Sequence, residues 1–109
     1  MATFNFDQFL EAVRAGVVDV AKTEALDFWQ DAKSDGEAFL ESTKKDLLVW
    51  TQQLADGLLS TDEFEFLVKG QKDLATMEAL TRAGVGAAKI DAVRTGVMNV
   101  VLTAALTKL

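Results

Sequence analysis

Three carboxylates at helical spacing are the first feature of this sequence that suggests chemistry. Asp27, Asp31 and Asp35 follow one another every fourth residue, which places them on one face of an α-helix. Carboxylate oxygens bind Ca²⁺ and Mg²⁺ when several of them surround the ion. A single straight helix presents its carboxylates along a line, so we expect a solvated strip paired with basic side chains and no metal site.

Three arginines that are each followed by glycine two residues later are the second candidate. They are Arg14, Arg82 and Arg94. A small residue beside a guanidinium leaves room for the carboxylate or phosphate of a partner. Arginines more commonly form surface ion pairs or pack their stems over a helix contact. The pattern therefore favours a helix surface over a dedicated binding site.

The residue types that are missing from the sequence exclude several classes of function. The 109 residues include no histidine, cysteine, tyrosine or proline. Histidine and cysteine are among the usual catalytic and metal-binding side chains. We therefore predict a protein that is not an enzyme and that holds no cofactor or metal. The absence of cysteine, together with an N-terminus that does not resemble a secretory signal, favours the cytoplasm.

The charge of the chain limits its partners. It carries 17 acidic and 11 basic residues, which gives a net charge of −6. This charge repels nucleic acid and anionic lipid at long range. We therefore expect no nucleic-acid partner.

An internal repeat indicates how the elements that carry these residues are arranged. EAVRAGVVDVAKTEAL (residues 11–26) and DAVRTGVMNVVLTAAL (residues 91–106) are identical at more than half of their aligned positions. The two copies are symmetric about the bond between Leu58 and Leu59, so a chain that folds back there brings them side by side and antiparallel. Their shared glycines and valines predict a close contact between the copies.

Two helix-start signals give the boundaries of this hairpin. Asn5 with Gln8, and Ser60 with Glu63, fit capping boxes, and apolar residues recur at helical spacing after each of them. Gly57 supplies a turn residue between them. We predict an all-α fold and a single domain over residues 1–109, namely a long antiparallel helical hairpin with a helix at about residues 6–55, a turn at residues 56–60 and a helix at about residues 61–107.

The same register brings opposite charges together. It places Asp35 opposite Arg82, and Asp73 opposite Lys44 and Lys45. Exposed pairs contribute at most about 1 kcal/mol each. They therefore support the register more than they support the stability of the fold.

Two glycine-containing segments leave alternatives open. Ser34-Asp35-Gly36 is a candidate helix end or kink, although the apolar periodicity continues through it. Gly84 and Gly86 fall opposite the region of Phe28 and Trp29 in the hairpin. They predict either a notch that packs against these aromatic rings, and that could hold an apolar ligand, or a hinge.

A helix of about 50 residues is about 75 Å long. Two such helices contact each other along one line, so a hairpin of this length has no thick core. The segment Val97–Leu106 is apolar on most of its sides, so a second chain is expected to cover it. A transmembrane span is disfavoured, since the apolar run is about ten residues long and a span needs about 20. We predict a homo-oligomeric helical bundle, with a dimer favoured, whose interface contains Val93, Val97, Val100, Val101 and Ala104.

These observations favour a non-catalytic structural or protein-interaction module that self-associates through long amphipathic helices. The alternative is a helical carrier that binds an apolar ligand or lipid between its helices, in the zone of Phe28, Trp29, Gly84 and Gly86. The two functions differ in whether the surplus apolar surface lies against another chain or around a ligand.

Overall fold

The computed structural model describes residues 5–71 and 76–108, and this part of the chain is helical with no β-strand. Asp73, which we expected opposite Lys44 and Lys45, lies outside the described residues. The predicted all-α fold class is confirmed. The α-helices are α1 (Phe6–Glu24), α2 (Trp29–Ala55), α3 (Thr61–Gly70), α4 (Glu78–Arg82) and α5 (Ala87–Lys108), and a 3-10 turn, η1 (Leu26–Phe28), joins α1 to α2.

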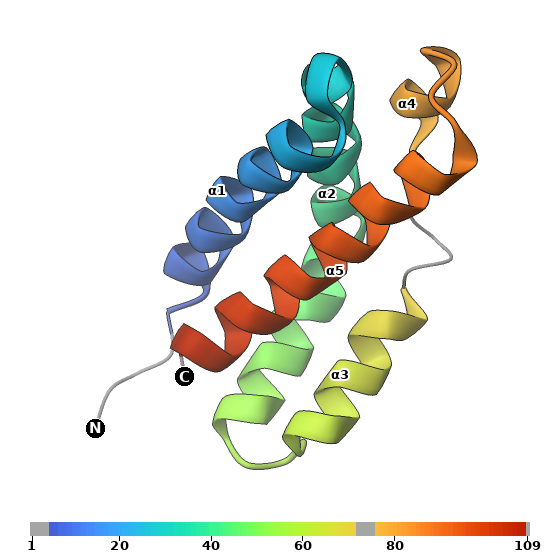
Figure 1. The fold of residues 1–109 in the computed structure, drawn as a ribbon. Helices are drawn as coiled ribbons and strands as arrows, with labels where there is room; N and C mark the ends of the chain where they lie inside the picture. The colour runs from blue at the N-terminus through green and yellow to red at the C-terminus, as the bar shows by residue number, and fades with distance from the viewer. Residues whose placement is uncertain (1–4, 72–75, 109) are drawn as a thin grey trace.

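The helices form a short bundle instead of one long hairpin (Figure 1). α1 and α3 each pack against both α2 and α5, and α4 packs against α2. The molecule measures 46 × 22 × 18 Å, whereas two uninterrupted helices would form a rod about 75 Å long. Short helices thus cover one another within a single chain.

α1 and α5 contain the two repeats and meet at a pair of reciprocal contacts between glycine and valine. A Cβ atom on Gly16 would lie 2.5 Å from Cγ1 of Val100, and one on Gly96 would lie 2.6 Å from Cγ1 of Val20. Any larger residue at these glycines would push the helices apart. The pairs run in opposite directions along the two helices, so the close antiparallel contact that the repeat predicts is present.

The prediction of one helix over residues 6–55 is wrong, because the chain reverses direction after α1. α1 ends at Glu24, and Leu26 adopts a left-handed conformation with φ of 51°. Glycine often occupies this position after a helix, since the left-handed conformation costs other residues about 1–2 kcal/mol. The reversal places α2 against α1, and the apolar surface buried there compensates for the strain at Leu26.

The alternative helix end at Ser34-Asp35-Gly36 is not used either. α2 continues through this segment. A Cβ atom on Gly36 would lie 2.5 Å from Cγ1 of Val17. Gly36 therefore lets α1 and α2 approach each other closely, and does not end a helix.

The second predicted helix, over residues 61–107, is divided into α3, α4 and α5. α4 is followed by Gly84, whose φ is 81°. The amide of Gly84 donates a hydrogen bond to the carbonyl of Thr81 (3.1 Å), and the amide of Val85 donates to the carbonyl of Leu80 (3.2 Å). These two bonds define a Schellman helix end. The helical path is therefore interrupted at Gly84, as the hinge alternative predicts.

The helix starts and the central turn agree with the sequence. Asn5 Oδ1 accepts a hydrogen bond from the amide of Gln8 (3.1 Å) at the start of α1. Ser60 and Glu63 form a complete capping box at the start of α3. Gly57 has a φ of 79° directly after α2. The predicted turn at residues 56–60 is confirmed between α2 and α3.

The hydrophobic core is continuous along the bundle and draws on all five α-helices. Burial of a large apolar side chain contributes about 1.5–3 kcal/mol, so even the short α4 is held by its buried leucine. The largest fully buried apolar side chains are Phe9, Val13, Val17, Leu47, Phe64, Val68, Leu80, Val93, Val97 and Val101.

We expect Gly96→Ala to destabilise the protein, because the added methyl would meet Cγ1 of Val20 at 2.6 Å and valine is stiff in a helix. Overpacking of this kind costs about 1–3 kcal/mol. Gly70→Ala is the matched control, since a Cβ atom there has nothing within 4 Å and alanine favours helix. Urea unfolding should show a lower midpoint for Gly96→Ala alone. Equal midpoints would contradict the close contact.

Candidate functional site

The residues predicted to form an oligomer interface lie mostly in the core of a single chain. Val93, Val97 and Val101 are each at most 1% exposed, and Ala104 is 8% exposed, while Val100 is half-buried. α1, α2 and α3 already pack against this helix. Within one chain, the apolar spacing of Val93, Val97 and Val101 thus marks the inner face of α5, and an interface between chains at these residues stays a prediction.

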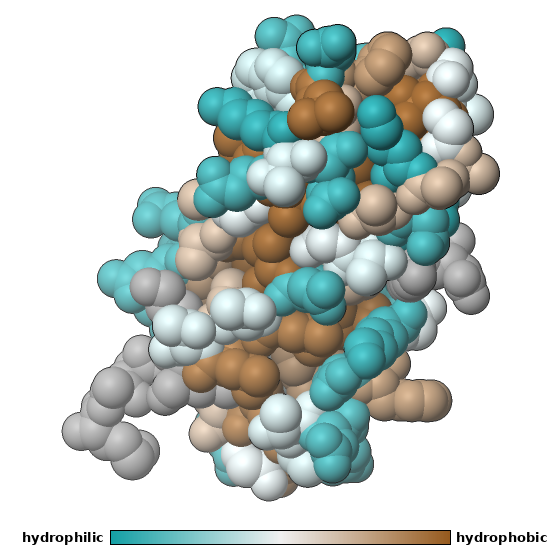
Figure 2. Space-filling model, in the orientation of Figure 1, coloured by the Kyte–Doolittle hydropathy of each residue, from teal (hydrophilic) through white to brown (hydrophobic). Residues whose placement is uncertain are grey.

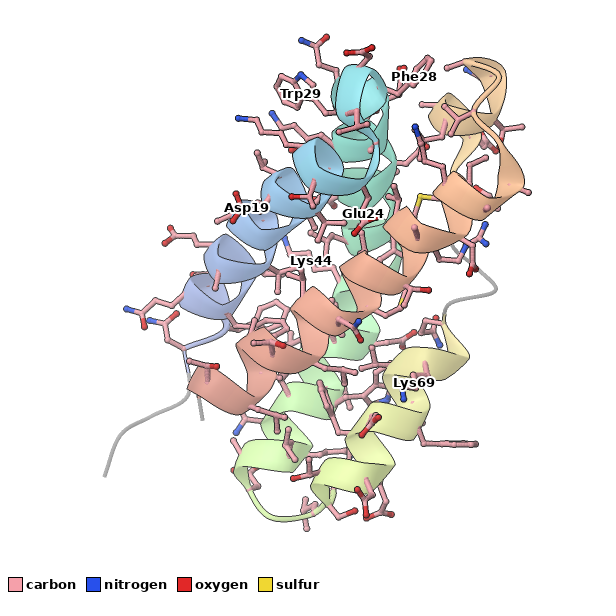
Figure 3. All side chains as sticks on the ribbon, viewed as in Figure 1. Asp19, Glu24, Phe28, Trp29, Lys44 and Lys69 are labelled. Carbon is pink, nitrogen blue, oxygen red and sulfur yellow. The ribbon has the colours of Figure 1, made fainter. Side chains whose placement is uncertain are left out.

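The four residues predicted to form a notch or apolar pocket do not come together as expected. Figure 3 shows Phe28 and Trp29 at the turn between α1 and α2, with their side chains pointing away from each other. Lys22 Nζ lies 5.0 Å from the centre of the Trp29 ring, which is a cation–π contact. A Cβ atom on Gly84 or Gly86 would have nothing within 4 Å. The packing notch is therefore absent at these glycines.

A shallow groove along the contact between α1 and α5 is the first hollow of interest on the described part of the surface. Its volume is about 560 Å³. Gly16 and Gly96 line it at the points where Val100 and Val20 pack against them. Figure 2 shows apolar surface on this face, with hydrophilic side chains around it. Among the described residues, no charged side chain lines this α1–α5 groove, whose lining is Ala12, Gly16, Val20, Gly96, Asn99, Val100, Thr103, Ala104 and Thr107.

The second hollow lies between α2 and α4, has a volume of about 420 Å³ and contains the buried side chain of Asp35. Oδ1 of Asp35 accepts a hydrogen bond from the amide of Ala79 (2.8 Å), and Oδ2 accepts one from the amide of Leu80 (2.9 Å). The first amides of a helix have no partner within it and carry partial positive charge. Asp35 therefore caps α4 from a distant part of the sequence.

This cap replaces the predicted ion pair between Asp35 and Arg82. Arg82 Nη2 lies instead 3.6 Å from Oε2 of Glu78 within α4. The sequence did contain a signal for the buried role of Asp35. It falls at helical spacing between Ala32 and Phe39, which both lie on the inner face of α2. The regular spacing of the three aspartates concealed this difference, because only the last of them is buried.

The third hollow lies on the exposed side of α3. Its volume is about 380 Å³, and its lining is Leu59, Asp62, Glu63, Phe66 and Leu67. Hydrogen bonds from the backbone amide and from the side chain of Ser60 lower the pKa of the Glu63 carboxyl. The surface is therefore both acidic and apolar, and sequence analysis had identified only its capping box.

The described residues were also compared with the requirements of a metal site and of a membrane span. No group of three or more acidic side chains is placed to hold a metal ion in the described part of the chain. The segment Ala87–Thr107 of α5 is long and apolar enough to cross a membrane by length and composition, a test that core helices of soluble proteins also pass.

No protein-family model, curated protein or solved structure matches this chain. Its function has to be inferred from the geometry of its surfaces.

We expect Asp35→Ala to destabilise the protein by about 2–4 kcal/mol, because two charge-assisted hydrogen bonds are lost and two helix amides lose their acceptor. Asp31→Ala, one turn earlier on α2, is the matched control. Urea unfolding should separate the two variants, and hydrogen exchange at the amides of Ala79 and Leu80 should accelerate in Asp35→Ala alone. Unchanged exchange at these amides would show that Asp35 does not cap α4.

Proposed function

We propose that this chain is a non-catalytic interaction module that associates with a second copy of itself through the α1–α5 groove. The observation that carries the proposal is the uncharged lining of this groove in a chain whose net charge is −6. Charged residues are depleted in the centres of protein interfaces. A groove free of charge is therefore a suitable surface for burial against another protein.

A twofold dimer suits this surface because each copy presents the same patch to the other. In such a contact, any charged residue near the axis would oppose its own equivalent. The groove avoids this repulsion, since its polar side chains are those of Asn99, Thr103 and Thr107. Amide and hydroxyl groups can donate and accept hydrogen bonds, so they can pair with their own equivalents.

The proposal keeps self-association but changes its site. The sequence predicts an interface on the apolar face of α5, and most of that face is buried within the chain. Val100 and Ala104 are the two predicted interface residues that also line the groove. The new site uses both repeats, whereas the predicted one used only the second.

A carrier of apolar ligands has weaker support. Ligand sites are concave and bury most of the ligand surface, whereas the α1–α5 groove is shallow. Phe28 and Trp29, which were expected to supply aromatic contacts, are absent from its lining. The groove therefore fits a protein surface better than an enclosed small molecule.

The oligomeric mass of Thr103→Glu tests the proposed dimer. Thr103 is exposed in the groove, and a twofold contact would bring the new carboxylates of the two chains close together. We expect the wild-type protein to sediment at twice the chain mass of 11.8 kDa, and the substitution to raise the dissociation constant about tenfold or more.

Thr61→Glu is the matched control, because Thr61 is exposed at the start of α3 and lies outside the groove. It should leave the dimer mass unchanged. A wild-type protein that sediments at 11.8 kDa at every concentration would contradict the proposal, and so would a Thr103→Glu variant that dimerises as strongly as the wild type.

A further inference from the structure

α3 has one buried side and one side that no other part of the described structure covers. Phe64 and Val68 are at most 1% exposed and face the core. Phe66 is 78% exposed, and it lies beside Leu67 and Leu59 in the third hollow. Asp62, Glu63, Phe66 and Leu67 recur at intervals of three and four along α3, so they share one face of the helix, and Leu59 lies beside this face just before the helix begins. We call it the Phe66 face.

The charge of the Phe66 face distinguishes it from the α1–α5 groove. Asp62 and Glu63 line it, and no basic side chain of the described residues does. Glu65 is next to it in the sequence, but its carboxylate lies 2.6 Å from Nζ of Lys69 within α3. The amide of Ser60 donates a hydrogen bond to Oε1 of Glu63 (2.9 Å), which holds that carboxylate in place at the edge of the hollow. The face therefore combines an aromatic anchor with an acidic edge.

This charge argues against a second copy of the chain as the occupant. A twofold contact through the Phe66 face would place Asp62 and Glu63 near the same two carboxylates of the other copy. Like charges opposed in a desolvated contact destabilise an association. Nucleic acid and anionic lipid are repelled for the same reason. A cationic protein segment meets the acidic edge with the opposite sign.

We propose that the Phe66 face binds a basic amphipathic helix of another protein. The apolar side of that helix would cover Phe66 and the neighbouring Leu59 and Leu67. Its lysine or arginine side chains would pair with the carboxylates of Asp62 and Glu63. A helix that lays its apolar face in a hydrophobic groove is a common mode of peptide recognition. Aromatic side chains are frequent anchors of such contacts.

Fluorescence anisotropy with a labelled model peptide tests this proposal. The probe is an amphipathic helix of leucine and lysine, about 18 residues or five turns long. We expect the wild-type protein to bind it, Phe66→Ala to weaken binding about tenfold or more, and Asp62→Asn to weaken it about twofold to threefold, with added salt reducing the difference. Phe66 is exposed, so its replacement leaves the core intact.

Two control variants change residues that do not line the Phe66 face. Leu106→Ala removes another exposed apolar side chain, and Asp19→Asn removes another exposed carboxylate. Both should bind the peptide like the wild type. The proposal is overturned if either control weakens binding as much as Phe66→Ala, or if a peptide with glutamate in place of lysine binds equally well.

The same variants separate this proposal from the proposed dimer. Phe66→Ala should leave the oligomeric mass unchanged, and Thr103→Glu should leave peptide binding unchanged. A loss of dimer mass in Phe66→Ala would assign this face to a second copy and overturn the proposal. Loss of the dimer in Thr103→Glu alone would leave the binding of a basic helix at the Phe66 face intact.

Discussion

The close approach of α1 and α5 is the constraint on which the rest of the structure depends. Gly16 admits Val100, and Gly96 admits Val20, so the two helix backbones come together at two reciprocal points. Contact at this distance fixes their register, because a shift by one residue would bring valine against a side chain. α2 and α3 then cover the inner sides of the pair, while the outer side remains as an uncharged groove.

The sequence correctly predicted features that depend on local chemistry or on the repeat. Its predictions were wrong at glycines that can serve either in a close helix contact or at a helix end. The repeat and the capping residues correctly indicated the antiparallel contact and the central turn. Gly36 was a candidate helix end but admits Val17 instead, whereas Gly84 was a candidate notch but ends α4. Both roles require the absence of a Cβ atom, so composition alone does not separate them. The reversal at Leu26 had no glycine or proline to mark it.

The surfaces of this fold differ in charge, and this difference favours a different partner for each surface. The described lining of the α1–α5 groove has no charge, so we propose contact with an identical surface there, whereas Asp62 and Glu63 on the Phe66 face favour the proposed cationic helix. The buried carboxylate of Asp35 serves neither surface, because both of its oxygens bind amides of α4. The valines predicted as an interface could not be assigned from sequence, since an internal helix face and an external one share the same apolar spacing.

The two repeats pack against each other within one chain through their glycines. Nuclear Overhauser measurements on a mixture of isotope-labelled and unlabelled protein test it most directly, because isotope filtering separates contacts within a chain from contacts between chains. We expect strong cross-peaks within a chain between the Gly16 Hα protons and the Val100 methyls, and between the Gly96 Hα protons and the Val20 methyls. Absence of both cross-peaks, or their appearance only between chains, would contradict it.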